Sequence, residues 1–468
     1  MSKPEPQKQQ KNNDERFTPP YPKPHKNPLR QFGRFLLGWQ SWIHTISETS
    51  YKMKMGQVKF PHIDFFVINE RSLVKKIGET DYEEYPKHHM QHEILCPLLG
   101  ESIFTTNGAQ WKRQRQMMNP SFAHTHLKRT FGTMDSAIQD LITRMQALDH
   151  SKPVAIDPLM THITADVIFR TILSQTIEEG DAYKVFENFN VFQDYTQRTM
   201  VLKSFHLPSG FFKKKIDQAC HNIRAVLTPI IAERYHNYHA GNKSDLNDIL
   251  STLLEARDDE GKPFPLDELV NQIAMLFLAG HETTASALTW SLYLLSKCPH
   301  MQDAIRSEIK EHEKDSHIVF ESIKGLNMTR NVFQEGLRLY PPVSFLPREA
   351  SKDCVIRNKK VAKGSMLSLS PWLIQRHRDQ WQEPDLFDPE RFNDPEQKES
   401  VKKSYFPFGL GPRICIGKGF AMQEAVLTIA NIVKNFELEN PKGQVPEPMA
   451  RVTTRPKKDI KLWLKPLS

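Results

Sequence analysis

The longest hydrophobic pattern in the sequence runs from Leu266 to Ser296 and is apolar on nearly all sides. Pro265 stands directly before it, where a proline is well tolerated, and Cys298 and Pro299 follow its end. A helix at the surface carries one apolar stripe, whereas a helix that is hydrophobic all round is buried. The pattern therefore predicts a long helix through the interior of the protein.

Helical periodicity also dominates the chain before and after this segment. It extends from Trp111 to about Lys314 and continues to Leu339, where two consecutive prolines stop it. A final helix is expected from about Ile416 to Phe436. The protein is therefore predicted to be mainly α-helical.

Short strands are expected where β-branched and aromatic residues cluster beside turn residues. Such clusters occupy Val58 to Asn69 and residues 343–370, with a turn at Lys363 and Gly364. Residues 371–407 are rich in proline and aromatic residues and are expected to form coil. Because long coils are uncommon within compact domains, this one indicates a functional loop system.

The domain organisation is expected to be simple. Residues 1–28 are rich in Pro, Lys, Gln and Asn and are predicted to form a flexible tail. No linker rich in glycine and serine divides the rest of the 468-residue chain, so residues 29–468 are predicted to form one catalytic domain.

No apolar run approaches the roughly 20 residues that a membrane-spanning helix needs. We therefore expect no transmembrane anchor and a cytoplasmic location. The segment from Phe35 to Ile43 contains Trp39 and Trp42, so it either dips into a membrane interface or forms an ordinary packed helix. The first alternative would make the protein loosely membrane-associated.

The charge balance is mildly basic, with 63 Lys and Arg against 55 Asp and Glu, a difference of 8. A basic surface favours an acidic electron carrier or an anionic lipid surface, and it also simply keeps a protein soluble. We expect no nucleic-acid partner.

Cysteines are few and scattered, without a C-x-x-C pair, which argues against a disulfide framework or a zinc site. They are Cys96, Cys220, Cys298, Cys354 and Cys415. Cys415 differs from the others because glycines at 409, 411, 417 and 419 surround it, at the predicted start of the last helix. The unpaired N–H groups of a helix start stabilise a thiolate, and a thiolate ligand on haem iron promotes cleavage of dioxygen. Cys415 is therefore predicted to be a metal ligand.

The segment Phe408-Gly-x-Gly-x-Arg413-x-Cys415-x-Gly417 resembles the cysteine loop of the cytochrome P-450 superfamily at every defined position. The resemblance extends from about residue 30 to the C-terminus. It implies a wedge-shaped helical fold with small β-sheets, and haem b bound between the central helix and the Cys415 loop. By the same resemblance, Phe408 packs beside the sulfur and Arg413 pairs with a haem propionate.

Two further motifs are similar to that family. Glu335 and Arg338, three residues apart on a helix, share one face and can form a buried pair; with Arg391 they match a Glu/Arg/Arg triad of structural rather than catalytic role. The resemblance also implies propionate contacts for Trp111 and Arg115, spaced four apart, and for Arg348.

The segment Ala279-Gly-His-Glu282-Thr283-Thr lies in the middle of the predicted central helix. Gly280 and the Thr283 hydroxyl can loosen the backbone hydrogen bonds there. A carboxylic acid beside an alcohol can relay protons to bound dioxygen, and the match to the family's A-G-x-[DE]-T-T motif implies this catalytic role for Glu282 and Thr283.

The resemblance also suggests which residues line the substrate pocket, and all of them are apolar. They are Ile103, Phe104, Met275, Ala279, Phe345, Leu346 and Val452. Residues 207–212 resemble a loop that gates entry. The whole chain resembles soluble bacterial relatives of fatty-acid hydroxylases, so the substrate is expected to be lipophilic: a fatty acid, a terpenoid or a similar molecule.

The expected function is therefore hydroxylation of a lipophilic small molecule with dioxygen. Two electrons must come from outside, because the chain has no glycine-rich dinucleotide fingerprint, so a ferredoxin or flavodoxin with its reductase is implied. The alternatives are a haem-thiolate peroxygenase or isomerase that needs no electron carrier, and a non-enzymatic haem sensor or carrier.

The stretch Lys87-His-His-Met-Gln-His92 raises the question of a metal site. No acidic or cysteine partner is fixed near it by the sequence alone. A loop with incidental histidines is therefore the favoured interpretation.

Overall fold

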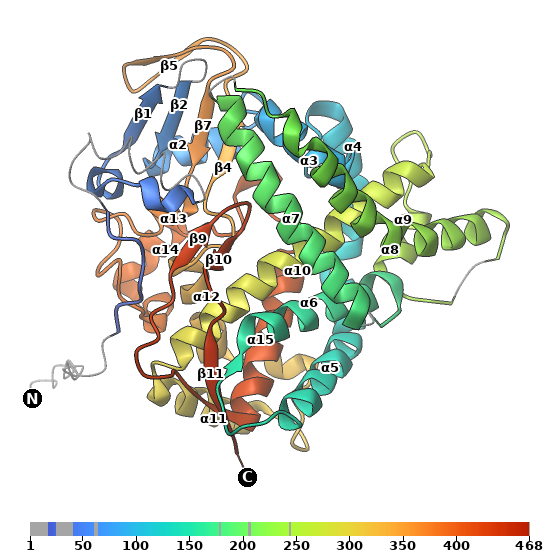
Figure 1. Ribbon diagram of the computed structural model, residues 1–468, viewed down its shortest axis with the longest axis vertical. Helices are drawn as coiled ribbons and strands as arrows, with labels where there is room; N and C mark the ends of the chain where they lie inside the picture. Colours follow the sequence, from blue (N-terminus) through green and yellow to red (C-terminus); the bar gives the residue numbers. More distant parts are fainter. Residues whose placement is uncertain are drawn as a thin grey trace, which may run out of the picture.

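The computed structural model describes residues 17–24, 41–59, 64–176, 179–204, 207–242 and 245–467. Helices make up most of this structure, and its largest β-sheet lies to one side (Figure 1). The mainly α-helical fold predicted from the sequence is thus confirmed. The helices are α2 (Arg71–Lys75), α3 (His89–Leu99), α4 (Gly108–Met118), α5 (His124–Gln146), α6 (Ile156–Leu173), α7 (Glu179–Ser204), α8 (Lys213–His239), α9 (Ile249–Glu255), α10 (Leu266–Leu295), α11 (Pro299–His312), α12 (Asn327–Leu339), α13 (Pro371–Ile374), α14 (Lys398–Ser404) and α15 (Lys418–Asn435).

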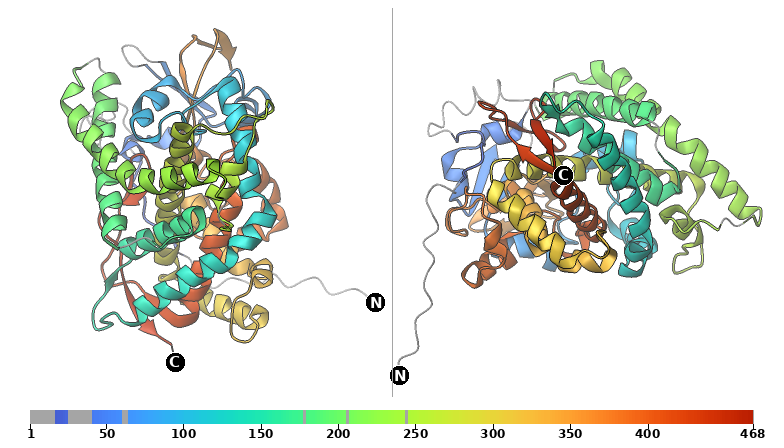
Figure 2. Two further views of the ribbon diagram at one scale, coloured as in Figure 1. Left: turned by 90° about the vertical axis from the view of Figure 1, so that its right-hand side faces the viewer. Right: turned by 90° about the horizontal axis from the view of Figure 1, so that it is seen from below.

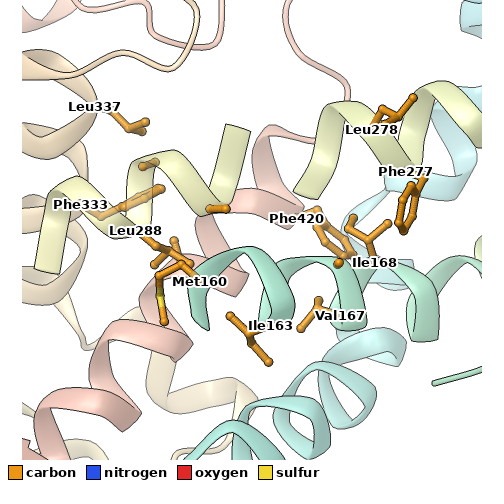
Figure 3. Packing of buried hydrophobic residues seen from close by; sticks show 14 of the residues in the cluster. Met160, Ile163, Val167, Ile168, Phe277, Leu278, Leu288, Phe333, Leu337 and Phe420 are labelled. Atoms are coloured by element: carbon orange, nitrogen blue, oxygen red, sulfur yellow. The ribbon is translucent and has the colours of Figure 1, made fainter. Parts of the chain in front are cut away.

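The central helix α10 crosses the middle of the molecule (Figure 1). It begins after Pro265, as the sequence predicts, and every residue from Gln272 to Leu295 is buried except for three. It packs against α6, α12, α15 and α8. Hydrophobic side chains of these neighbours meet around α10: Met160, Ile163, Val167 and Ile168 come from α6, Phe333 and Leu337 from α12, and Phe420 from α15 (Figure 3).

The largest sheet has four strands in the order β1-β2-β7-β4. Its strands β1 (Met55–Lys59) and β2 (Asp64–Ile68) form the early β-segment predicted from the sequence, and β4 (Leu346–Glu349) and β7 (Met366–Leu369) come from residues 343–370. The pairing of β2 with β7 is parallel, and the other two pairings are antiparallel. This sheet lies on the side of the molecule opposite α8 and α9 (Figures 1 and 2).

Three smaller sheets complete the β-structure. One is three-stranded, in the order β3-β11-β8, and the other two are the hairpins β9-β10 and β5-β6. Their strands are β3 (Val154–Ala155), β5 (Cys354–Ile356), β6 (Lys359–Val361), β8 (Phe436–Glu439), β9 (Pro448–Ala450), β10 (Thr454–Pro456) and β11 (Lys461–Pro466). The hairpin β9-β10 is tied to α10, because the Ser286 hydroxyl donates to the Thr454 carbonyl oxygen.

Residues 371–407, predicted as coil, contain more helix than expected. The helices α13 and α14 and two short 3-10 helices lie within this range. Proline and serine at the start of α13 explain part of the difference: the Ser370 hydroxyl accepts from the Leu373 N–H, and Pro371 occupies the first helical position, where its missing N–H costs nothing.

Residues 17–24 belong to the range 1–28 predicted as a flexible tail, yet they pack against the folded domain. The Phe17 carbonyl oxygen accepts from the Phe387 N–H at 3.0 Å, and the Pro20 carbonyl oxygen accepts from the Tyr340 hydroxyl at 2.6 Å. The tail prediction therefore does not fit this segment, because aromatic side chains of Phe17 and Tyr21 give it apolar surface to bury. Residues 1–16 and 25–28 lie outside the described residues.

Among the described residues, no helix combines the length and the apolar character needed to cross a membrane. Most of the segment 35–43, for which the sequence suggests either a membrane contact or a packed helix, lies outside the described residues. Its described end enters the 3-10 helix Trp42–Thr45, where Ile43 is buried.

Candidate active site

The loop that carries Cys415 is a compact turn held against the segment Lys76–Thr80, a single π-helical turn. Gly411 has a φ of 64°, and a Cβ atom at this position would lie 2.4 Å from the Gly78 carbonyl oxygen. Only glycine permits so close an approach. The Cys415 N–H donates to the Phe408 carbonyl oxygen at 2.8 Å, which closes the turn two residues before Gly417, the N-cap of α15.

All five cysteines are free thiols, and Cys415 is the exposed one. Although the residue is exposed, the loop around its sulfur removes much of the water, and this desolvation raises the pKa of the Cys415 thiol. The Gly417 N–H and the positive charges of Arg115 and Lys418 act in the opposite direction without outweighing it. The helix start alone therefore does not produce the thiolate that the sequence suggests, whereas a coordinated metal ion would deprotonate the thiol outright.

An accessible strip interrupts the otherwise buried middle of α10. It consists of Ala279, Gly280 and Thr283, the three exceptions between Gln272 and Leu295. Ala279 and Thr283 are one helical turn apart and share a face. Because α15 packs on α10 and starts just behind Cys415, the strip and the exposed thiol belong to neighbouring elements.

The backbone of α10 is not opened at this strip, which corrects the expectation that Gly280 and Thr283 loosen it. The helix is continuous, and the Thr283 hydroxyl donates to the Ala279 carbonyl oxygen at 2.6 Å within it. Gly280 has a different purpose: a Cβ there would lie 2.6 Å from Cδ1 of Ile168, so the glycine lets α6 approach. The Thr164 hydroxyl of α6 reinforces this contact by donating to the His281 carbonyl oxygen at 3.0 Å.

Glu282 is buried and fully engaged in a polar network. Arg455 donates to its two carboxylate oxygens at 3.0 and 2.6 Å, and the Thr453 hydroxyl and the Gln193 amide donate to it as well. These partners outweigh desolvation and lower the pKa of Glu282 to about 2. The carboxylate therefore stays charged at neutral pH and anchors the hairpin β9-β10 to α10.

A second buried acid, Glu424 of α15, has the opposite character. Neither of its carboxyl oxygens has a hydrogen-bond partner among the described residues. Desolvation raises the pKa of Glu424 well above its ordinary value, and the nearby Thr284 hydroxyl offsets this only in part. Glu424 therefore resists ionisation more than an ordinary glutamic acid, and it lies close to Thr284, the residue that follows Thr283.

Four cationic side chains gather on the other side of the Cys415 loop. Lys87 and Arg348 face each other across an isolated β-bridge, and both are buried. Arg413 stacks over the rings of Tyr82 and Trp111, and Arg115 donates to the Ile414 carbonyl oxygen at 2.8 Å. Trp111 and Arg115 thus lie on α4 where the sequence predicts them, and they meet Arg413 from the loop.

Among the described residues no carboxylate forms an ion pair with this cation cluster, although the charge of Glu83 acts on Arg413. The Nε atoms of Arg348 and Arg413 are buried without a partner. Desolvation and the charge of Arg413 lower the pKa of Arg348 to about 9, and desolvation, Arg413, Arg348 and Arg115 lower that of Lys87 strongly. Buried cations are normally paired, so the cluster fits an anionic group.

The residues present therefore fit haem. A thiolate ligand suits iron from one side, and the propionates of haem are carboxylates that suit the four cations. Cys415, Arg413, Arg115 and Arg348 were predicted for this purpose from the sequence. Lys87 was missed, because its only sequence signal was a neighbourhood of histidines.

The buried ion-pair triad is present as predicted. Arg338 donates to both carboxylate oxygens of Glu335 at 2.7 and 2.8 Å, and Arg391 donates to Oε1 at 2.9 Å. The three side chains are at most 1% exposed. Arg338 also donates to the Gln375, Pro384 and Leu386 carbonyl oxygens, so the triad ties α12 to the segment that leads to the Cys415 loop.

The segments that carry the predicted pocket residues come together around α10. The Ile103 N–H donates to Gln272 of α10 at 3.1 Å. Ser344, next to Phe345, contacts Thr454, near Val452, through their hydroxyls at 2.6 Å, and a Cβ at Gly409 would lie 3.8 Å from Leu346. Of the seven residues, Ile103 and Met275 are buried, Phe104 is exposed, and Ala279, Phe345, Leu346 and Val452 are partly exposed.

Besides Lys87, two residues at this site were missed from the sequence. Arg455 lies in a polar segment, Thr453-Thr-Arg-Pro456, that gives no hint of its burial or of its ion pair with Glu282. Glu424 had a usable signal, because it interrupts the apolar periodicity of a helix predicted to be internal.

Comparison with known proteins identifies the family of the chain. Residues 22–463 match the family model described as Cytochrome P450. Cytokinin hydroxylase of Arabidopsis thaliana is 28% identical over 86% of this chain and 78% of its own length. Secologanin synthase 1 of Catharanthus roseus is 27% identical over 88% and 80%, and cyclooctatin synthase of Streptomyces melanosporofaciens is 28% identical over 79% and 78%. Similarity to soluble bacterial fatty-acid hydroxylases, expected from the sequence, is not what these names indicate, since two of the three come from plants.

Proposed function

The chain belongs to the cytochrome P450 family and is a monooxygenase, and from this premise we propose that it hydroxylates a lipophilic small molecule, with Cys415 as the axial ligand of haem b. The observation that carries the proposal is the exposed thiol of Cys415 close to the cations Lys87, Arg348 and Arg413, none of which forms an ion pair among the described residues. A thiolate-bound metal between a helix and propionate-binding cations accounts for both features at once.

The bound haem supplies the iron at which dioxygen is reduced. The chain's own residues bind and orient it: Arg115, Arg348, Arg413 and Lys87 neutralise the propionates, and Trp111 supports the Arg413 guanidinium. Phe408 packs against the core and closes the loop through its carbonyl oxygen.

Proton delivery is assigned to Thr283, whose hydroxyl lies on the accessible strip of α10. Glu282 was predicted as its acidic partner. Because that carboxylate is held in an ion pair with Arg455 and has a pKa lowered to about 2, we assign it a positioning role that keeps Thr453 and the β9-β10 hairpin against α10, with direct proton transfer left to Thr283 and water.

The substrate class follows from the residues around the strip. Phe345, Leu346, Val452 and Ala279 all offer apolar surface and no charge, which favours a lipophilic molecule such as a fatty acid or terpenoid. The names of the relatives, a cytokinin hydroxylase and two synthases, are compatible with small organic substrates.

Electrons are proposed to come from a ferredoxin or flavodoxin with its reductase, and the protein is proposed to work in the cytoplasm. The net charge of +8 favours an acidic carrier. The family's general need for an external electron source supports the same view.

Two measurements test the proposed function. Titration of the purified protein with lipophilic compounds should give a low-to-high-spin shift of its absorption spectrum when a substrate displaces water from the iron. Turnover of that compound should then require NADPH, a reductase and a carrier. Full turnover with hydrogen peroxide or an organic hydroperoxide, and none with electrons, would instead establish the peroxygenase or isomerase alternative.

A further inference from the structure

Helix α3 carries two metal-ligating side chains on one face. His92 and Cys96 are four residues apart in this helix, so they stand one above the other along the same side. The sequence favoured a loop with incidental histidines here, without a fixed acidic or cysteine partner. The structure shows that the stretch is helical from His89 onward and that Cys96 and Glu101 lie close to His92.

A carboxylate is brought to the same place by the end of the helix. α3 ends at Leu99, and Gly100 turns the chain with a φ of 54°. A Cβ at Gly100 would lie 2.2 Å from the Asn271 side chain of α10, so the turn is pressed against the central helix. Glu101 follows directly, and its carbonyl oxygen accepts from the Gln114 amide at 3.2 Å. The position of Glu101 is thereby fixed from two sides.

The three donor atoms converge on one point. Nε2 of His92 lies 2.7 Å from Oε1 of Glu101, and Sγ of Cys96 lies 3.8 Å from the same oxygen. All three atoms lie within 4.8 Å of one another. The His92 and Glu101 side chains are 41% and 46% exposed, so an ion can enter from solvent.

We propose that His92, Cys96 and Glu101 form a binding site for a zinc-class divalent transition-metal ion, separate from the haem site. One nitrogen, one sulfur and one carboxylate oxygen are ligands that zinc accepts together, with water in the fourth position of a tetrahedron. Bonds of about 2.0–2.3 Å at tetrahedral angles place neighbouring ligand atoms about 3.3–3.6 Å apart. The sulfur and oxygen, 3.8 Å apart, are already near this spacing, and the imidazole and carboxylate need to separate by about 0.6 Å from their 2.7 Å.

Binding would exchange protons for the metal. Desolvation and the charge of Glu101 raise the pKa of the Cys96 thiol, so a zinc ion must displace its proton. The ion would then hold the end of α3 to the turn before Ile103, whose carbonyl and N–H groups are already bound by Lys87 and Gln272. The site thus sits next to a segment predicted to line the substrate pocket.

A second group, at the start of the same helix, provides a matched control. His88, the N-cap of α3, His89 and Glu349 of β4 also lie close enough to hold an ion. In this group His88 is buried, its Nδ1 already accepts from the Met90 N–H, and its ring lies against that of His89, tilted by 31° with centroids 4.2 Å apart. The burial and this hydrogen bond make the group the poorer site.

The test measures zinc bound to the full-length, haem-loaded protein after equilibration with buffered, low-micromolar zinc. The wild type should bind one zinc ion per chain. Cys96→Ser, His92→Gln and Glu101→Gln should each weaken binding at least tenfold, whereas His89→Gln and Cys354→Ser should leave it unchanged. X-ray absorption at the zinc edge should show one sulfur at about 2.3 Å, and this sulfur should disappear in Cys96→Ser.

Several outcomes would overturn the proposal. They are the absence of stoichiometric zinc in the wild type, unchanged affinity in Cys96→Ser, and loss of zinc in His89→Gln with retention in His92→Gln. Since the His92 and Glu101 side chains are partly exposed, their variants should fold normally, and the result does not depend on the behaviour of the cysteine variant alone. Neither the zinc-binding measurement nor the X-ray absorption measurement depends on catalytic turnover.

Discussion

At the scale of single residues, the proposed proton delivery depends on Thr283. Its hydroxyl donates within α10 to the Ala279 carbonyl oxygen at 2.6 Å, so the oxygen's lone pairs stay available on the accessible side. Thr283→Ala should leave folding, haem content and substrate binding nearly unchanged. Product formed per NADPH should fall and released hydrogen peroxide should rise, because losing one positioned proton path typically costs about 10²–10⁴-fold in that step.

Water partly replaces the lost hydroxyl, so the measured loss of coupling should be smaller than that limit. Thr283→Ser keeps a hydroxyl at the same position and should retain most of the coupling. Full coupling of NADPH to product in Thr283→Ala would show that the relay has been assigned to the wrong residue.

The two buried acids near α10 should respond to pH with opposite signs. The pKa of Glu424 is raised in the folded protein, so its contribution to stability is greatest below the unfolded pKa and is lost as pH rises toward the folded value. Glu424→Gln removes the ionisable group, and with it this loss of stability with rising pH, while keeping the shape of the side chain. The variant should therefore become more stable than the wild type as pH rises above about 4.5, the ordinary Glu pKa.

Glu282→Gln is the matched comparison. The pKa of Glu282 is lowered to about 2, so its contribution is present at neutral pH and lost as pH falls from about 4.5 towards 2. This variant should be less stable than the wild type at neutral pH. Thermal unfolding between pH 4 and 9 measures both differences, and equal shifts in the two variants would contradict the opposite pKa shifts of the two acids.

At the scale of elements, the contact between the Cys415 loop and the turn Lys76–Thr80 depends on Gly411. Gly411 and Gly443 both have positive φ, at 64° and 78°, but a Cβ meets backbone only at Gly411, 2.4 Å from the Gly78 carbonyl oxygen. Gly443→Ala should lower the free energy of unfolding only by the strain of the left-handed backbone, about 1–2 kcal/mol. Gly411→Ala should lower it clearly more. It should also lower haem content, since the Cys415 loop must move away from the turn Lys76–Thr80.

Denaturant unfolding together with the haem-to-protein absorbance ratio measures this difference. Equal losses of stability in the two variants would show that the close approach at Gly411 is relieved cheaply and that the loop is less rigid than described.

Elements with a strong local signal were predictable from the sequence. The central helix was predicted over Leu266 to Ser296 and is observed as Leu266–Leu295, because its apolar pattern and Pro265 act locally. The Cys415 loop was recognisable because the local backbone conformation requires its glycines, as the positive φ of Gly411 shows. α3 was missed, since Pro97 lies inside it and its sequence is rich in histidine; the contacts with α8 and α10 stabilise it instead.

Features that depend on distant residues were not predictable in the same way. The ion pair of Glu282 joins residues 173 positions apart, and the partner, Arg455, has no local pattern that reveals it. Lys87 joins the cation cluster only because a β-bridge sets it beside Arg348. Spacing along the chain identifies candidate groups, but folding decides which of them are paired and charged.

At the scale of the whole molecule, the triad of Glu335, Arg338 and Arg391 joins the helical part to the long segment before the Cys415 loop. Arg338→Ala leaves the buried Glu335 carboxylate with a single cation and frees three carbonyl oxygens. Breaking such a pair costs about 3–5 kcal/mol, so the variant should give little soluble, haem-containing protein.

Glu399→Ala provides the control, because Glu399 pairs with Lys403 on the surface, where an ion pair contributes about 0–1 kcal/mol. This variant should fold normally. Arg338→Ala protein with normal haem content and a selective loss of activity would show that the triad acts in catalysis rather than in folding.

The central claim is that the Cys415 sulfur binds the haem iron, and the absorption spectrum of the reduced protein with carbon monoxide tests it most directly. The wild type should show the strongly red-shifted Soret band of a thiolate-ligated haem, as should variants with serine at Cys96, Cys220, Cys298 or Cys354. Cys415→Ser should lose this band, because a hydroxyl is far too weakly acidic to replace the thiolate. A Cys415→Ser protein that retains the band, or a wild type that never shows it, would contradict the account.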